Sequence, residues 1–409
     1  MQASAAILLA TSWLSGEDLS FASPEDVGVS SERLGTMHRL VQNAVDSHPL
    51  TGAVTLVARD GEIIDWRTFG YRDKLKQTPM QRDDIFAMAS LTKCVVSAAA
   101  MILVERGEMK LSDPIAKFLP EFANPRVFLR READRTFTRP AKSAIQVRHL
   151  LTHTGGWPGN QSKGEIGAIG KANRYRLAGT LDEMTIELAK MPLEADPGTA
   201  WIYGPSTDVL AVLIQRVSGQ PFEVFLRENI FDPLGMEDTY FFVPEEKQDR
   251  VVSIFTHREG ELVYDVPPED HARGQRAYPS GGGGLYSTPP DYFRFMQMLL
   301  NGGSYQGRSI LGKKTVDSIT RNQTGFLGDK PKSNNRSEAW GFGVSVKIDT
   351  AYEKDMSSVG TFGWGGSTTT WCRADPQERY IALIFSQHRP MASVFVPPFA
   401  NTAWQAIVE

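Results

Sequence analysis

Residues 90–104 read SLTKCVVSAAAMILV, and this stretch decides how the rest of the chain is interpreted. Three positions separate Ser90 from Lys93, just under one helical turn, so a helix would place them on one face. The run Cys94–Val104 is apolar and predicts a buried helix. A Lys at the start of such a helix calls for a reason, because burying a charge is costly. An amine beside a serine hydroxyl can take its proton, so the S-x-x-K spacing makes Ser90 a candidate nucleophile and Lys93 its activating partner.

Two further segments carry candidate chemistry. The first is Tyr203-Gly204-Pro205, directly before a predicted helix at Ser206–Ser218. A tyrosine next to an amine can act as a general base; the alternative is a loop tyrosine that packs on the following helix.

The second is the glycine-rich strand segment Phe362–Ser367, FGWGGS. Glycines in a strand mark close approach of backbone or ligand. A strand with little side chain can present a backbone N–H that, with the N–H of Ser90, forms an oxyanion hole; the alternative is a glycine-rich bulge.

Strand patterns occur at both ends of the chain. Gly52–Arg59 is rich in β-branched residues, Asp60-Gly61 is a hairpin turn signal, and Glu62–Gly70 is the return strand. Four more strands are predicted near the C-terminus, at Trp340–Ile348, Gly360–Gly366, Thr368–Ala374 and Arg379–Ser386. A helix is predicted after Ser30 or Ser31, and another over Pro398–Val408. We therefore expect one antiparallel sheet that both termini build, flanked by the two terminal helices.

The middle of the chain has a different pattern. Residues 111–336 are mostly helical in periodicity, with Pro and Gly between the segments. The predicted organisation is a discontinuous α/β sheet domain, residues 24–110 and 337–409, with a mainly α-helical domain at 111–336 inserted. Two polar stretches, Leu129–Arg139 and Gly328–Arg336, are expected to be surface excursions. An anion site is the alternative for the first, which holds several Arg.

Composition limits the function. Of 409 residues, 41% are hydrophobic and 22% charged, which is ordinary globular usage. Lys and Arg number 44 against 48 Asp and Glu, so a nucleic-acid binder is disfavoured. Cys94 and Cys372 are the two cysteines, too few for a disulfide framework or a zinc cluster. They are expected to be free thiols, with a single bridge between them as the alternative.

The N-terminal region bears on localisation. Ala5–Ala10 is a short apolar run, but no Lys or Arg precedes Arg33, as a secretory signal would require. No stretch approaches the roughly 20 apolar residues of a membrane span. We expect a cytoplasmic protein, and a periplasmic or secreted one is the alternative.

Taken together, these motifs resemble a known family. The three candidate segments occur in order with His149–Gly156 (HLLTHTGG), Ile230–Met236 (IFDPLGM) and Ser280–Pro289 (SGGGGLYSTP). The chain is similar, from about Ser30 to its end, to the serine β-lactamase and penicillin-binding-protein-like superfamily, and within it to the class C β-lactamase-like esterases, the family VIII carboxylesterases. The resemblance implies an α/β (α+β) fold of the β-lactamase/transpeptidase type. An antiparallel sheet with flanking helices would adjoin an all-α domain, and the active site would lie in the cleft between them.

The resemblance also implies roles for individual residues. Ser90 would be the acylated nucleophile, and Lys93 and Tyr203 would activate it and handle proton transfer. The backbone N–H groups of Ser90 and Ser367 would hold the oxyanion. No metal or organic cofactor is implied, because the nucleophile and base are both side chains.

Two departures from the lactamase pattern indicate the substrate. Class C lactamases carry Tyr-x-Asn where this chain has Pro205, which offers no hydrogen-bonding side chain. They carry Lys-Thr-Gly where this chain has Trp364-Gly365-Gly366, which removes a positive charge and adds apolar surface. Both changes favour neutral esters over penicillin-type substrates.

Further residues are weighed for the site. Trp157 and Asn160 follow a segment that borders the cleft in relatives, so they are candidate substrate contacts. His149 and His153 lie four apart but have no Glu between them, and a structural role is favoured over a metal site. No serine has glycines at both positions two away, which argues against a G-x-S-x-G hydrolase.

The sequence therefore predicts a serine carboxylesterase that acts on short-chain neutral esters. The alternatives are a β-lactamase weakly active on cephalosporins, an acyltransferase or a peptidase acting on D-amino-acid peptides, and, from a different class, a non-catalytic binding protein. The expected partner is a small-molecule ester; the oligomeric state is left open.

Overall fold

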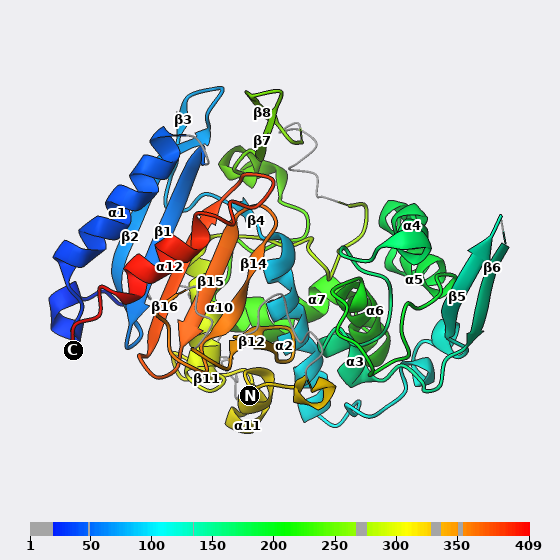
Figure 1. Ribbon diagram of the computed structural model, residues 1–409. Coiled ribbons are helices and arrows are strands. Elements are labelled where there is room, and N and C mark those ends of the chain that lie inside the picture. The colour runs from blue at the N-terminus through cyan, green and yellow to red at the C-terminus, as the bar shows by residue number, and fades with distance from the viewer. Residues whose placement is uncertain (1–18, 48–49, 134, 267–275, 329–336, 351–354) are drawn as a thin grey trace, which may run out of the picture.

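A single large sheet organises the molecule (Figure 1). The computed structural model describes residues 19–47, 50–133, 135–266, 276–328, 337–350 and 355–409. Within them the sheet has eight strands in the order β12-β13-β14-β15-β16-β1-β2-β3. The strands are β1 Gly52–Arg59, β2 Glu62–Asp73, β3 Thr78–Pro79, β12 Glu338–Trp340, β13 Ser345–Lys347, β14 Phe362–Gly366, β15 Thr370–Asp375 and β16 Tyr380–Ser386.

The two ends of the chain meet in the middle of this sheet. β1 pairs antiparallel with β16, from Ala53 opposite Ser386 to Arg59 opposite Tyr380. β1 and β2 form the expected hairpin, whose turn residues Asp60 and Gly61 both have positive φ, as a type I′ turn requires. The predicted fold class, an antiparallel sheet built from both termini, is confirmed.

One predicted strand is wrong in detail. Trp340–Ile348 was expected to be continuous, but the chain turns back on itself between β12 and β13, which pair with each other. Gly343 has φ +82°, and the N–H of Gly341 donates to the carbonyl of Val344 at 2.8 Å. The alternating pattern concealed this turn, because the glycines that permit it also occur inside strands.

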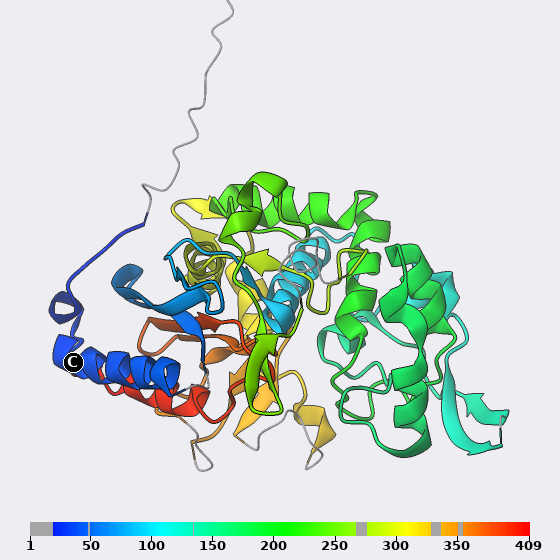
Figure 2. The same cartoon turned by 90° about the horizontal axis from the view of Figure 1, so that it is seen from above.

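Helices cover both faces of the sheet. On one face α1 (Ser31–Asp46) and α12 (Val396–Trp404) lie side by side (Figures 1 and 2). Their apolar sides and the sheet form one buried cluster. On the other face α2 (Thr92–Glu105) and α10 (Pro289–Leu300) belong to a larger cluster that continues into the helical part of the chain. α10 contacts β1, β15 and β16, so residues 111–336 also supply part of the cover of the sheet.

Most of the remaining helices lie beyond α2 as seen from the sheet, whereas α11 lies below the sheet (Figure 1). They are α3 Val147–Leu151, α4 Gly164–Ala172, α5 Leu181–Ala189, α6 Ser206–Ser218, α7 Phe222–Leu226, α8 Asp232–Leu234 and α11 Lys313–Ile319. α2 contacts α6, α7 and α11, so it is the element through which the sheet and the helical part share one core. Among the described residues no single helix is long and apolar enough to cross a membrane, although the bent pair Ser206–Ser218 and Phe222–Leu234 passes by length and composition.

Both cysteines lie in this core. Cys94 on α2 and Cys372 on β15 are free and fully buried. Burial raises the pKa of the Cys94 thiol to about 11. The expectation of packed thiols, with no bridge between them, agrees with the structure.

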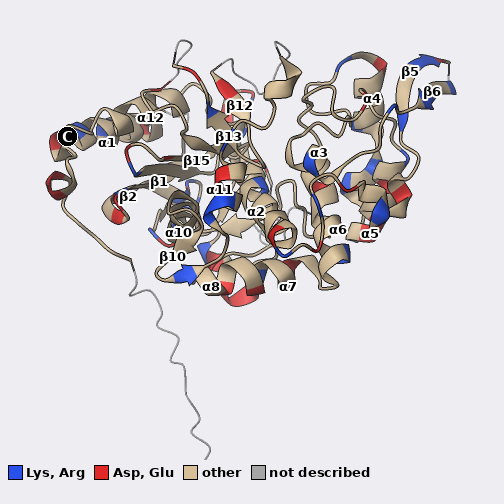
Figure 3. Cartoon of the chain, turned by 90° about the horizontal axis from the view of Figure 1, so that it is seen from below, with Lys and Arg blue, Asp and Glu red and all other residues tan. Residues whose placement is uncertain are grey.

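The arginine-rich stretch Leu129–Arg139 forms most of a β-hairpin. β5 (Arg126–Glu132) pairs with β6 (Arg135–Pro140), and both strands are largely exposed at the far end of the helical part. Figure 3 shows Lys and Arg gathered on this hairpin, whereas elsewhere both signs of charge are interspersed. Most of the second stretch, Gly328–Arg336, lies outside the described residues, as do residues 5–10.

Substitution of Gly343 tests whether the turn between β12 and β13 has to fit against α2. An added Cβ would overlap the side chain of Ser97 and come 3.0 Å from the carbonyl oxygen of Lys93. The positive φ adds strain. We expect Gly343→Ala to lower the free energy of unfolding by about 2–4 kcal/mol in urea titrations.

The matched control is Gly35→Ala within α1, where the added Cβ meets only the end of the Arg39 side chain at 3.7 Å. Because glycine is a poor helix former, this variant should gain about 0.5–1 kcal/mol. Equal effects of the two substitutions would contradict the packing described for Gly343.

Candidate active site

Ser90 and Lys93 meet at the start of α2. Ser90 lies on a 3₁₀ turn, Ala89–Leu91, that leads directly into the helix, and Lys93 belongs to the first helical turn. The Nζ of Lys93 lies 3.2 Å from the Oγ of Ser90. Lys93 is only 4% exposed. The spacing in the sequence thus gives the direct contact that proton transfer needs.

The backbone before Ser90 is held in an unusual conformation. Ala89 has φ +46°, a left-handed value that costs a non-glycine residue about 1–2 kcal/mol. The preceding carbonyl, that of Met88, accepts a hydrogen bond from Thr370 Oγ1 at 3.1 Å. Gly366 packs so closely here that a Cβ would come 2.5 Å from the same carbonyl oxygen. The ends of β14 and β15 therefore fix the turn that carries Ser90, which is how such strain persists in a folded protein.

The amine of Lys93 is anchored from a second direction. Its Nζ also donates to the carbonyl of Gly282. The N–H of Gly282 donates in turn to Asp208 Oδ1 at 3.0 Å, and Ser280 Oγ donates to the same oxygen at 2.6 Å. Asp208 lies in the first turn of α6 and is 3% exposed. Asp208 therefore holds Gly282 in place, and the Gly282 carbonyl in turn holds the Lys93 amine.

Sequence reasoning missed Asp208, although a signal for it exists. The signal is the glycine run after Ser280, because glycines mark close approach of backbone. Gly282 could not carry a Cβ, which would lie 2.6 Å from Asp208 Oδ2, and a Cβ on Gly281 would overlap the backbone of Thr207. Because no side chain fits at Gly281 or Gly282, the start of α6 lies directly against this backbone, and Asp208 on α6 can reach it.

Tyr203 approaches Lys93 from the loop before α6. The Lys93 Nζ lies 4.8 Å from the centre of the Tyr203 ring. The indole Nε1–H of Trp364, on β14, donates to the Tyr203 hydroxyl oxygen at 2.9 Å. Tyr203 also contacts His153 and Trp340 in an aromatic cluster. The sheet and the helical part together therefore hold this phenol beside Lys93.

The two histidines of the HLLTHTGG segment are structural. His149 Nδ1 accepts from the N–H of Gln146 at 3.1 Å, which caps α3, and burial lowers its pKa to about 4. His153 is fully buried, and burial, followed by the nearby Lys93, lowers its pKa well below the usual value. It packs 4.7 Å from Tyr203, ring centre to ring centre. No group of His, Cys, Asp or Glu suited to a metal ion occurs in the described part of the chain.

A cavity of about 330 Å³ opens over these groups. It brings together Ser90, Lys93, Tyr203, Ser367 and Asn160 from segments far apart in the sequence. Ser90 and Ser367 line the same cavity, as an oxyanion hole made by their N–H groups would need. The other lining residues are Ala89, Tyr175, Arg176, Gly204, Asp208, Arg276, Ser280, Gly282, Gly283, Gly284 and Arg389.

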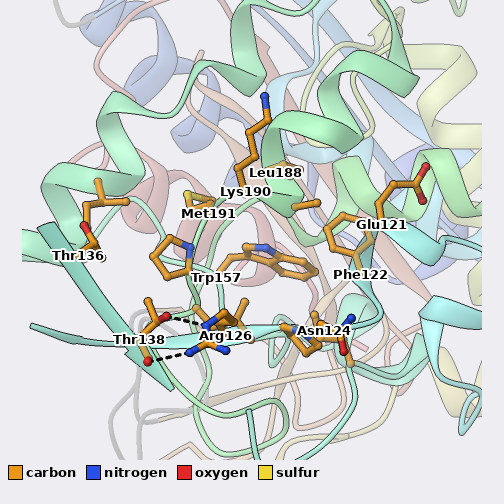
Figure 4. Close-up of a pocket in the computed structure, with 16 residues that line it drawn as sticks. Glu121, Phe122, Asn124, Arg126, Thr136, Thr138, Trp157, Leu188, Lys190 and Met191 are labelled. Atoms are coloured by element: carbon orange, nitrogen blue, oxygen red, sulfur yellow. Dashed lines mark hydrogen bonds between the residues drawn. The ribbon is translucent and has the colours of Figure 1, made fainter. Parts of the chain in front are cut away.

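Four expected substrate contacts do not line this cavity. Trp364 and Gly365 line a different depression, and the tight packing of Gly366 makes it a spacer below the Ser90 turn. Trp157 is 2% exposed and forms the floor of a separate cavity of about 370 Å³ with Phe122 (Figure 4). Trp157 therefore belongs to a second cavity, where its ring packs against Phe122, whereas Asn160 lines the cavity that contains Ser90.

Comparison with known proteins places the chain in a family. The model of the family described as Beta-lactamase matches residues 37–401. Protein Rv1367c of Mycobacterium tuberculosis is 34% identical over 366 residues, which cover 87% of this chain and 90% of that one. Esterase EstB of Burkholderia gladioli is 32% identical over 343 residues, which cover 79% of this chain and 82% of that one.

A solved structure shows the same fold. EstCE1, described as a hydrolase with promiscuous acyltransferase activity, superposes with a TM-score of 0.77 at 24% identity, covering 92% of this chain and 99% of that one. The family match spans most of the chain, including Ser90, Lys93, Tyr203 and the glycine-rich strand before Ser367. This chain belongs to the beta-lactamase family.

Proposed function

We propose that the protein is a serine carboxylesterase that hydrolyses short-chain carboxylic esters through an acyl-enzyme on Ser90. The observation that carries the proposal is the 3.2 Å contact between the Lys93 Nζ and the Ser90 Oγ, at the base of an open cavity. The similarity to Esterase EstB supports an ester as the substrate.

The acylation step follows from the geometry. Ser90 Oγ attacks the ester carbonyl carbon, and its proton passes to the pair formed by Lys93, which contacts Ser90, and Tyr203, which lies against Lys93. The N–H groups of Ser90 and Ser367 stabilise the negative charge on the carbonyl oxygen. The bond to the alcohol oxygen then breaks, and the same proton is delivered to the departing alcohol.

Deacylation reverses these roles. Water adds to the acyl carbon, gives its proton to Tyr203 and Lys93, and the Ser90 Oγ leaves with that proton as the carboxylic acid forms. An acceptor alcohol in place of water would give acyl transfer by the same route. Product analysis with and without a short alcohol, and an assay with a cephalosporin, separate hydrolysis from the transferase and lactamase alternatives.

Replacement of the nucleophile is the direct test of the proposed function. Ser90→Ala should lower kcat on 4-nitrophenyl acetate and butyrate by about 10⁴-fold or more, because the covalent route is lost. Intact-protein mass spectrometry after treatment with a fluorophosphonate should show one adduct on the wild type and none on Ser90→Ala.

The matched control is Ser47→Ala at the end of α1, which should keep both the adduct and the turnover. A folded wild-type protein with no adduct and no ester turnover would remove the esterase assignment and turn attention to a binding role.

Trp364 should act through Tyr203. Tyr203→Phe removes the proton-carrying oxygen and should lose nearly all turnover. Trp364→Phe keeps an aromatic ring but loses the N–H that donates to the Tyr203 hydroxyl, so kcat should fall about 5–10-fold while KM changes little. Steady-state kinetics measures both parameters.

Trp404→Phe is the control for this pair. It also removes an indole hydrogen bond, the one to Asp375 on the opposite face of the sheet, and should leave kcat unchanged. If Trp364→Phe raised KM and left kcat intact, Trp364 would be a substrate contact and not a positioning residue.

Gly282 is expected to control the position of the Lys93 amine. In Gly282→Ala the new Cβ must displace the Asp208 carboxylate, which holds the Gly282 N–H, so the carbonyl that accepts from Lys93 shifts. We expect kcat to fall at least about tenfold. Gly35→Ala serves as the glycine control, and unchanged kcat in a folded Gly282→Ala protein would show that this anchor is dispensable.

A further inference from the structure

The wall of the catalytic cavity carries two guanidinium groups around one phenol. Arg176 Nε donates to the Tyr175 hydroxyl oxygen at 2.8 Å. Arg276 Nη1 donates to the Tyr278 hydroxyl oxygen at 2.8 Å, and its guanidinium carbon lies 5.9 Å from the centre of the Tyr175 ring. Arg176, Arg276 and Tyr175 all line the cavity that contains Ser90. Neither the proposed esterase chemistry nor the anchoring of Lys93 uses Arg176 or Tyr175.

These residues belong to a closed series of contacts around the cavity. From Lys93 it runs through Gly282 to Asp208, whose Oδ1 lies 3.7 Å from Arg276 Nη1. It continues past Tyr175 to Arg176, whose Nη2 donates to Asn160 Oδ1 at 3.5 Å. The Asn160 N–H then donates to the carbonyl of Tyr203 at 3.2 Å, and the Tyr203 ring lies against Lys93. Contacts therefore link Lys93 to the two arginines in both directions around the cavity, through Asp208 to Arg276 and through Tyr203 and Asn160 to Arg176.

The charges along this wall do not balance. Asp208 is the one carboxylate among the described residues that line the cavity. It already accepts hydrogen bonds from the Ser280 hydroxyl and the Gly282 N–H, and it forms an ion pair with Arg276. Arg389 is paired outside the cavity with Asp265 at 3.0 Å. For Arg176 no ion-pair partner lies within the part of the chain that the structure describes. Lys93 also has no carboxylate partner among the described residues, but its amine is held by the Ser90 hydroxyl and the Gly282 carbonyl. Arg176 is therefore the cavity arginine that no described carboxylate pairs with.

Arg176 is exposed to solvent, so its charge alone would indicate little. Its orientation is the informative feature, because Tyr175 and Asn160 hold two of its nitrogens at the cavity wall. A guanidinium fixed in this way presents its remaining N–H groups as a planar fork, the geometry that matches a carboxylate. Tyr175 is 5% exposed and accepts from Arg176, which leaves its own O–H hydrogen for a bound oxygen.

We propose that the cavity selects esters that carry a carboxylate away from the scissile bond, and that Arg176, with Tyr175 and Arg276, binds this carboxylate. The inference rests on the proposed esterase function and names the substrate class of the same site. The carboxylate does not react: it orients the ester while Ser90 performs the chemistry described above.

This inference revises the expectation of neutral esters. That expectation came from Pro205 and from Trp364, which stands where lactamases have a cationic residue. Trp364 does not line the cavity and uses its indole N–H on Tyr203. The positive charge that the motif lacks is supplied from a different element, the turn Arg174–Leu177, and from Arg276.

The test compares esters that differ only in charge. On the acyl side, 4-nitrophenyl half-esters of succinate, glutarate and adipate are compared with the same compounds capped as methyl esters. On the alcohol side, 4-acetoxybenzoate is compared with its methyl ester. In the series that places its carboxylate at Arg176, kcat/KM should favour the charged ester by about tenfold at low salt. The preference should shrink toward 0.5 M salt, because an exposed guanidinium is screened.

Substitutions in the turn Arg174–Leu177 then test whether Arg176 causes the preference for charged esters. Arg176→Ala should lower kcat/KM for the preferred charged ester by about tenfold and change that for its capped analogue by less than about twofold. Arg176→Lys should restore only part of the loss, because it keeps the charge but not the fork. Arg174→Ala is the matched control: it removes one positive charge from the same turn, but Arg174 does not line the cavity.

Two different failures are distinguishable. If the wild type reacts with the fluorophosphonate and turns over neutral esters, but shows no charge preference in either series, the carboxylate inference is overturned and the esterase function stands. Equal losses in Arg174→Ala and Arg176→Ala would also overturn it, as a general effect of surface charge. If neither labelling nor turnover of any ester is seen, the proposed function itself fails.

Discussion

The buried amine of Lys93 is the constraint on which the active site depends. A charge taken out of water is costly unless it is met by polar partners, and this one is met from three directions. The Ser90 hydroxyl comes from the turn that leads into α2, the Gly282 carbonyl comes from the glycines after Ser280, and the Tyr203 ring comes from the loop before α6. Each partner belongs to a different segment, so the amine is placed only when the sheet, α2 and the helical part have packed together.

The close contacts around the site follow from this requirement. The turn that carries Ser90 keeps a left-handed Ala89 because Thr370 and Gly366 fix the backbone before it. The Gly282 carbonyl reaches Lys93 only because the chain there has no side chain between it and Asp208. A left-handed residue and closely packed glycines therefore occur where the backbone must approach Ser90 and Lys93, as expected for a site whose geometry is fixed before substrate binds.

Local patterns predicted much of the fold and the centre of the site. The β-branched run of β1, the Asp60-Gly61 turn and the S-x-x-K spacing are properties of neighbouring residues, so one sequence is enough to interpret them. Contacts between distant segments were beyond such patterns. Asp208 and Arg276 matter because α6 and the chain before Ser280 meet in three dimensions. Trp157 and Asn160 are three residues apart, yet they line different cavities, because the chain turns at Gly159, where a Cβ would overlap the Tyr203 carbonyl.

One carboxylate, that of Asp208, connects the anchor of Lys93 with one arginine of the cavity wall, Arg276. Asp208 holds the Gly282 N–H with one oxygen and faces Arg276 with the same oxygen, so the position of the Lys93 amine and the charge of the cavity wall are coupled. A change at Asp208 would disturb both and could not separate them. Arg176 has no contact with Asp208 or Lys93 among the described residues; its polar contacts are to Tyr175 and Asn160. Substrate charge preference could therefore change at Arg176 while the geometry around Ser90 stays intact.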